Sequence, residues 1–145
     1  MSVKPFRSIA GTLLNKGPSL LPQTATATVY TVSGLVLITG LFAVFTSVTT
    51  NPNCTYTIGP ASFGAGASLT NPQPVVGQCL VPQLGTGTTS GQVEVLQGFP
   101  LYQENFVMQY FLINSNITLT TNANVNAQLQ WYCWWLPFTP GSSVS

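Results

Sequence analysis

The chain has 145 residues and a net charge of +1, and only 3% of its residues are charged whereas 45% are hydrophobic. Soluble proteins carry about 25% charged residues, so this composition argues against an ordinary cytosolic globular protein and gives no basis for electrostatic binding of nucleic acid. Disorder goes with low hydrophobicity and high net charge, and we therefore expect a folded chain.

The first predicted element is a basic amphipathic segment over residues 1–23. Apolar side chains follow helical spacing there, with basic residues on the flanks. Such a segment is typical of a short helix that lies on an anionic membrane face, and a flexible tail that only supplies charges for membrane topology explains it equally well. All basic residues of the chain lie in it: Lys4, Arg7 and Lys16.

Residues 24–50 are predicted to form a transmembrane or assembly helix. The stretch from Val29 to Val48 has no charge and no proline, and as a helix it would be roughly 30 Å long, the thickness of a bilayer's hydrocarbon core. We favour a membrane-spanning helix; a buried assembly helix and a cleaved segment are the alternatives. Because all basic residues precede it, the positive-inside rule predicts an inside N-terminus and an outside C-terminal domain.

Small residues recur in this predicted helix at every seventh position. On a helix this spacing keeps small side chains on one face and lets another backbone approach closely. The pattern predicts a helix-packing face; the alternative is that such residues are simply common in membrane helices. The residues are Thr26, Ser33, Gly40 and Ser47.

Residues 51–145 are predicted to form an exterior β domain. Short β-prone runs alternate there with turns rich in Gly, Pro, Asn and Thr, and several runs place an apolar residue at every second position. We therefore expect a mainly β protein with one N-terminal α-helix, its strands forming a small antiparallel β-sandwich or barrel. The predicted strands are 54–58, 77–81, 92–97, 105–113, 117–121 and 125–138, with loops over 59–76 and 84–91.

The last predicted strand contains all three tryptophans of the chain. Three roles are open for its aromatic residues: packing in the core, anchoring a protein interface, or forming an aromatic belt at a membrane surface. The candidate interface aromatics are Trp131, Tyr132, Trp134 and Trp135.

Residues with catalytic chemistry are few. The chain has no His and no Asp, which excludes the common Ser-His and Cys-His nucleophile pairs and most zinc sites. Glu94 and Glu104 are its only acids, and an acid–base pair would require both in one cleft. We predict no catalytic, cofactor-binding or metal-binding residues, and no enzyme.

Cysteine and asparagine residues suggest two kinds of modification. Three cysteines without CxxC spacing fit one disulfide with one thiol left over. We favour a bridge between Cys54 and Cys79. The odd cysteine, Cys133 in this pairing, is also a candidate for linking subunits. Asn53 and Asn116 each begin an N-glycosylation triplet, "NCT" and "NIT".

The order of these elements, an apolar segment before a Thr- and Asn-rich β domain with glycosylation triplets, resembles archaeal type IV pilins. With its basic N-terminus, low charge and small-residue stripe, the chain is also similar to membrane-anchored virion proteins of viruses that infect hyperthermophilic archaea, including spindle-shaped ones. The second resemblance implies a non-enzymatic structural protein in a virion envelope or cell membrane. Its partners would be membrane lipid, copies of itself and other structural proteins, with no nucleic acid, small-molecule substrate or cofactor.

Three alternatives to this function are open. The first is a pilus or thread subunit, in which the apolar helices pack in a filament core. The second is an accessory subunit of a membrane complex, and the third is a receptor-binding module.

Overall fold

The structure is a computed structural model in which part of the chain is described. The description covers residues 11–47, 54–60, 69–71, 76–82, 93–96, 110–124 and 126–145. Side chains are described throughout these ranges except at 54–55, 69–71, 81–82 and 93–96.

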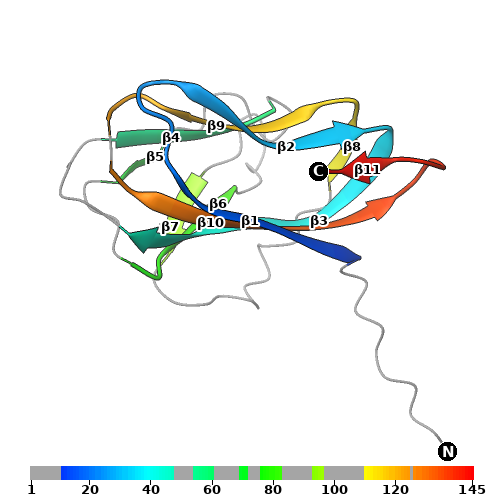
Figure 1. Cartoon of the computed structure of the whole chain (residues 1–145), viewed down its shortest axis with the longest axis horizontal. Helices are drawn as coiled ribbons and strands as arrows, with labels where there is room; N and C mark the ends of the chain where they lie inside the picture. Colours follow the sequence, from blue (N-terminus) through cyan, green and yellow to red (C-terminus); the bar gives the residue numbers. More distant parts are fainter. Residues whose placement is uncertain are drawn as a thin grey trace, which may run out of the picture.

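Two antiparallel sheets lie face to face and form the layers of the fold, as Figure 1 shows. We name the lower layer in that view the β3 sheet. Its strand order is β1 (Thr12–Leu20), β10 (Gln128–Pro137), β3 (Leu35–Ser47), β6 (Cys79–Pro82) and β7 (Val93–Leu96). A further strand, β8 (Tyr110–Ile113), also pairs with β3. The upper layer, the β9 sheet, has the order β11 (Ser143–Val144), β2 (Thr26–Ser33), β9 (Asn116–Thr121), β4 (Cys54–Gly59) and β5 (Leu69–Asn71).

The described strands confirm the mainly β class, and the sheets are open. Strands β1 and β7 end one strand order, and β11 and β5 end the other, so the described residues do not close into a barrel. All six strands that the sequence predicts after residue 50 overlap observed strands, namely β4, β6, β7, β8, β9 and β10. Within the predicted loop over 59–76, however, Leu69–Asn71 form strand β5. Thr12–Leu20, which belong to the segment interpreted as an amphipathic helix or a flexible tail, form strand β1.

The helix predicted over residues 24–50 is wrong for the part that the structure describes. Residues Thr26–Ser33 and Leu35–Ser47 form strands β2 and β3, which lie in different sheets; residues 48–50 lie outside the described ranges. The run is long and apolar because β3 is an interior strand, with the core on one face and aromatic side chains beside it on the other. Its many β-branched residues also favour a strand over a helix.

In the described residues, no helix is long and apolar enough to cross a bilayer.

Gly34 is the single residue between β2 and β3, where the chain passes from one sheet to the other. Its φ is +72°, and a Cβ at this position would lie 2.7 Å from the Cβ of Ser142. The backbone N–H of Gly34 donates to Oδ1 of Asn114 at 2.8 Å. A glycine is required here because both the backbone conformation and the space exclude a larger residue.

One hydrophobic core fills the space between the sheets. Its largest fully buried side chains include Tyr30 of β2, Phe45 of β3 and Tyr56 of β4, and the rings of Phe45 and Tyr56 meet edge to face across the layers at 5.9 Å. The core runs from Leu21 to Val144. The predicted boundary between residues 50 and 51 therefore does not separate two bodies, because strands from both sides of it share this core and the same sheets.

Candidate functional site

Aromatic side chains cover the outer face of the β3 sheet. Leu41, Ala43 and Phe45 of β3 point into the core, so strand alternation turns Phe42 to the opposite face. The Phe42 ring is stacked between two rings of β10, with centroids 5.0 Å from Tyr132 and 5.6 Å from Trp134. These rings form a short ladder across two neighbouring strands.

Gly40 makes room for the indole of Trp134. The two residues are register partners in β3 and β10, and a Cβ at Gly40 would lie 3.1 Å from Cε3 of Trp134. An aromatic ring over a cross-strand glycine covers backbone that would otherwise be open to water. At this pair of positions the large indole of Trp134 therefore packs over a glycine and not against a second large side chain.

The same outer face continues toward β8 with more exposed apolar side chains. Phe111, Ile113 and Phe138 are 58%, 64% and 52% exposed, respectively. The rings of Phe111 and Phe138 meet edge to face at 4.8 Å. Together with the aromatic ladder, these residues form what we name the apolar face: Leu13, Leu35, Leu37, Phe42, Val44, Phe111, Ile113, Tyr132, Trp134, Leu136 and Phe138.

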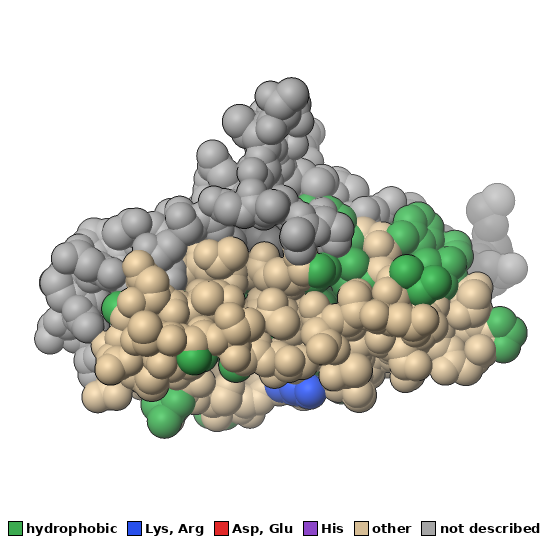
Figure 2. Space-filling view, turned by 90° about the horizontal axis from the view of Figure 1, so that it is seen from above, with side chains coloured by type: hydrophobic (Ala, Val, Ile, Leu, Met, Phe, Trp, Pro, Cys, Tyr) green, Lys and Arg blue, Asp and Glu red, His purple; other side chains and the backbone are tan. Residues whose placement is uncertain are grey.

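The outer face of the β9 sheet carries hydroxyl groups instead. Thr26 and Thr120 are register partners whose Oγ1 atoms are 2.7 Å apart. Thr28 and Thr118 are also register partners. Figure 2 looks onto this side, where most of the described surface is neither hydrophobic nor charged and hydrophobic side chains gather toward one end. We name this surface the threonine face: Thr26, Thr28, Thr57, Thr118 and Thr120.

The Trp-rich end predicted from the sequence is split by strand alternation. Trp131 is 3% exposed and belongs to the core, and the partly buried Trp135 packs against the core. Tyr132 and Trp134 point outward into the apolar face. Core packing therefore accounts for two of the four residues, and an interface role is left for the other two.

The predicted helix-packing face does not exist as one surface. Thr26 and Ser33 lie in β2, whereas Gly40 and Ser47 lie in β3, and these strands belong to different sheets. In a strand, moreover, residues seven positions apart point to opposite sides. Gly40 alone acquires a packing role, beneath Trp134.

Lys16 has a structural role that its predicted function as a topology charge did not suggest. It lies in edge strand β1, and its Nζ donates to the backbone oxygen of Val29 in β2 at 3.0 Å. The same Nζ lies 5.1 Å from the ring centroid of Tyr30. The side chain thus connects the two sheets at one edge; Lys4 and Arg7 lie outside the described residues.

The remaining candidate residues are not brought together into a reactive site by the described structure. Cys79 is buried, but the side chain of Cys54 is not described, and their pairing stays a prediction. Asn116 is exposed at the start of β9, while Asn53 lies outside the described residues. Only the backbone of Glu94 is described, and Glu104 lies outside the described residues. In the described part of the chain, no group of three or more His, Cys, Asp or Glu residues is placed to hold a metal.

Burial raises the pKa of four described groups, Tyr30, Cys79, Tyr110 and Cys133, and the shift is largest at Tyr30 and Cys133. Burial raises the pKa of the Cys133 thiol from its ordinary 9.0 to about 12. Burial also raises the pKa of the Tyr30 hydroxyl well above its usual range, with a further rise from the nearby Cys133. Both groups are therefore neutral at physiological pH, and a thiol with so high a pKa is a poor nucleophile.

Comparisons of the chain with protein-family models, with curated proteins and with solved structures found no match. Function must therefore be inferred from the surfaces and contacts described above.

Proposed function

We propose that this chain is a non-enzymatic structural protein that assembles with copies of itself through its apolar face, as part of a viral or surface structure. The observation that carries the proposal is the exposure of Phe111, Ile113 and Phe138, each more than half accessible on a face that already contains an aromatic ladder. Contiguous exposed apolar patches on folded domains are typical of interaction sites.

Charge and sheet edges support a second copy as the partner. The residues of the apolar face are uncharged, so two copies placed face to face have no charge repulsion to overcome there. Edge strand β1 is a poor site for strand addition because Lys16 points inward from it, Pro18 lacks an N–H, and its register shifts between Lys16 and Ser19. Edge strands β5 and β11 have three and two residues. Association through a face is therefore favoured over association through these edges.

The described geometry gives no support to membrane anchoring. The expectation of an envelope or cell-membrane location with the N-terminus inside came from the helix over 24–50, and strands β2 and β3 occupy most of that range. The pilus alternative depended on packing of the same helix in a filament core. Location, lipid contact and other structural partners stay predictions.

The test uses two charge-bearing double variants of the full chain. Phe111→Asp with Ile113→Asp places two carboxylates on the apolar face, whereas Thr26→Asp with Thr28→Asp places the same charge on the threonine face. All four side chains are exposed, so we expect both variants to fold, as checked by circular dichroism. We expect the first variant to weaken self-association at least about tenfold and the second to change it little, measured by sedimentation velocity from 1 to 100 µM. A monomeric wild-type chain throughout this range, or equal loss in both variants, contradicts the proposal.

A further inference from the structure

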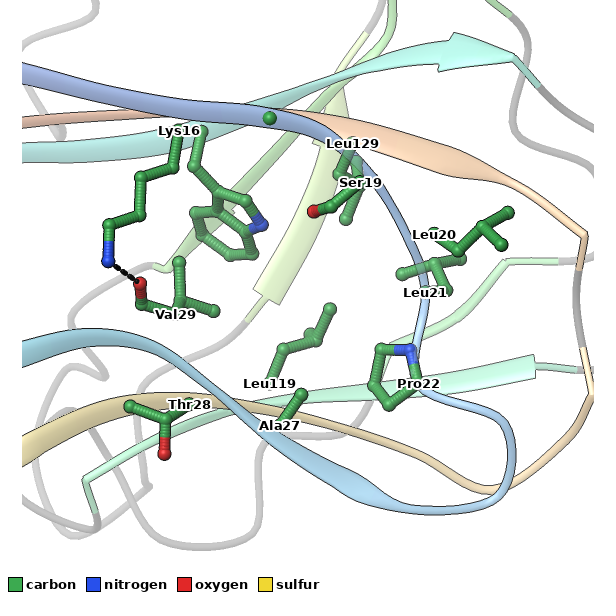
Figure 3. A pocket seen from close by; sticks show the side chains of 12 residues that line it. Lys16, Ser19, Leu20, Leu21, Pro22, Ala27, Thr28, Val29, Leu119 and Leu129 are labelled. Atoms are coloured by element: carbon green, nitrogen blue, oxygen red, sulfur yellow. Dashed lines mark hydrogen bonds between the residues drawn. The ribbon is translucent and has the colours of Figure 1, made fainter.

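A cavity of about 330 Å³ lies between the two sheets at the edge formed by β1 and β2 (Figure 3). Its walls come from β1, β2, β9, β10 and the segment that connects β1 to β2. The volume is at the lower end of the range of pockets that hold small molecules, about 300 to 1,000 Å³. It is therefore large enough for a small ligand and too small for a whole bilayer lipid.

Irregularities in both bordering strands hold this edge open. The pairing of β1 with β10 shifts between Lys16 and Ser19, and the pairing of β2 with β9 shifts between Thr28 and Tyr30. Bulges bend a strand locally and are common beside functional sites. Here the two register shifts lie on opposite walls of the same opening. The opening therefore arises from both strands and is not a packing defect in one of them.

The floor of the cavity is apolar and its rim is mixed. Four lining residues are almost fully buried in the core: Leu21, Leu119, Leu129 and Trp131. Ser19 and Ala27 are exposed at the rim, and in Figure 3 the methyl group of Ala27 points into the space between the sheets. The site therefore offers an apolar interior and an opening to solvent.

Lys16 lies at one end of the opening, as Figure 3 shows. Of the three donors of an ammonium group, one bonds the backbone oxygen of Val29, and the positive charge also lies over the ring of Tyr30. Neither partner carries a formal negative charge. The described side chains include no Asp or Glu, because the chain's two acids, Glu94 and Glu104, lack described side chains. The cation at the cavity rim is thus not neutralised by any described side chain.

The geometry points to a binding site for a free, medium-chain fatty carboxylate, with its alkyl chain among the buried leucines and its carboxylate on the ammonium group of Lys16. An apolar interior with a few polar groups that fix orientation is the usual design of small-molecule sites. The charge at the rim selects an anionic head, and the volume selects a single chain of medium length. The carboxylate is held as a ligand and undergoes no reaction.

Titration calorimetry on the full chain tests the site with octanoate and decanoate, each below its micelle concentration, and with the matched alcohol decanol below its solubility limit. Each added methylene should tighten binding about three- to fourfold until the cavity is full. Decanoate should bind about tenfold tighter than decanol, and Lys16→Gln should remove this difference while leaving decanol unchanged. Equal affinity of the two ligands for the wild-type chain, or no saturable binding at 1 mM, overturns the assignment.

Two further variants separate the cavity from the apolar face. Ala27→Phe places a ring in the opening and should weaken decanoate binding at least about thirtyfold, whereas Thr31→Phe, on an exposed position of the same strand away from the cavity lining, should not change it. If Phe111→Asp with Ile113→Asp weakens decanoate binding and Ala27→Phe does not, the ligand is adsorbed on the apolar face and the proposed site is wrong. Self-association is measured separately, so failure of either proposal leaves the other intact.

Discussion

The apolar face and the threonine face have the same antiparallel pairing geometry and opposite surface chemistry. On the β3 sheet, Phe42 is stacked between Tyr132 and Trp134; on the β9 sheet, the corresponding outward positions carry hydroxyl groups such as those of Thr26 and Thr120. Neither face depends on charge. The difference shows that a nearly uncharged chain can still have two chemically distinct faces: hydroxyl groups keep one compatible with water, and aromatic rings make the other apolar.

The largest expected effect comes from the residue that joins the two sheets. Gly34→Ala should lower the free energy of unfolding by about 3 kcal/mol, because it adds backbone strain at a φ of +72° and a Cβ 2.7 Å from that of Ser142. Gly141→Ala is the matched control: its φ is +77°, but nothing lies within 4 Å of the added Cβ, and we expect a loss of about 1 kcal/mol. Urea unfolding measures both. Equal losses would mean that the contact with Ser142 relaxes freely.

Removal of one side chain from each face gives a direct comparison of their packing. Phe42→Ala should cost about 2 kcal/mol, because the ring is half-buried and loses two stacked neighbours. Thr120→Ala should cost about 0.5 to 1 kcal/mol for the lost hydroxyl contact with Thr26. The same urea titrations apply. A larger loss at Thr120 would show that the threonine face is the more tightly packed of the two.

Alkaline pH should act on the interior rather than on either face. The pKa of Cys133 is raised to about 12 from its ordinary 9.0, so the unfolded state loses this proton before the folded state does. Below pH 9 this contribution to stability is fully present, and it declines as the pH rises toward 12; between pH 9 and pH 10 the expected loss for this group is up to about 1.4 kcal/mol. Urea unfolding at pH 8, 9 and 10 should show a smaller decline in Cys133→Ala. Parallel declines in both proteins would rule out the thiol as the source.

Salt should have the smallest effect. Because neither outer face uses charge, self-association through the apolar face should change by less than about threefold between 0.05 and 0.5 M NaCl. Ammonium sulfate should strengthen it, since excluded salts favour burial of apolar surface. Light scattering at matched protein concentration measures both. Dissociation by NaCl would instead indicate ion pairs at the interface and direct attention away from the apolar face.

Much of the second half of the fold was predictable from alternation and turn residues, and the first half was not. Strands β9 and β10 alternate visibly in "ITLTT" and "AQLQW", and each was placed within a few residues. The run over β2 and β3 misled because an interior strand beside aromatic neighbours is as apolar as a membrane helix. Gly34, which interrupts the run, is also an ordinary residue of membrane helices, so its type alone does not indicate a break.

The candidate sites depended on tertiary contacts that sequence patterns do not show. Lys16 was identified as one of three basic residues, but its bond to Val29 arises only when β1 and β2 face each other across the sheets. Phe111 and Phe138 meet although they lie far apart in the chain, so no local spacing predicts the apolar face. The Trp-rich end was partly predictable, since period-two alternation separates Trp131 from Tyr132 once a strand is assumed.

The position of β3 in its sheet has a consequence for synthesis of the chain. This strand of 13 residues is bordered by β10, β6 and β8, all of which emerge later from the ribosome, and β1 likewise pairs with β10, with Thr12 opposite Trp135. Among the described strands, the most apolar segment therefore has no neighbour in its sheet until β6 has been made, and it lacks its longest partner until β10 follows. A nascent chain of this kind exposes a strand prone to aggregation, and its folding is limited by contacts between distant parts of the sequence. Chaperone binding to the segment from Leu35 to Ser47 during translation would be the natural protection.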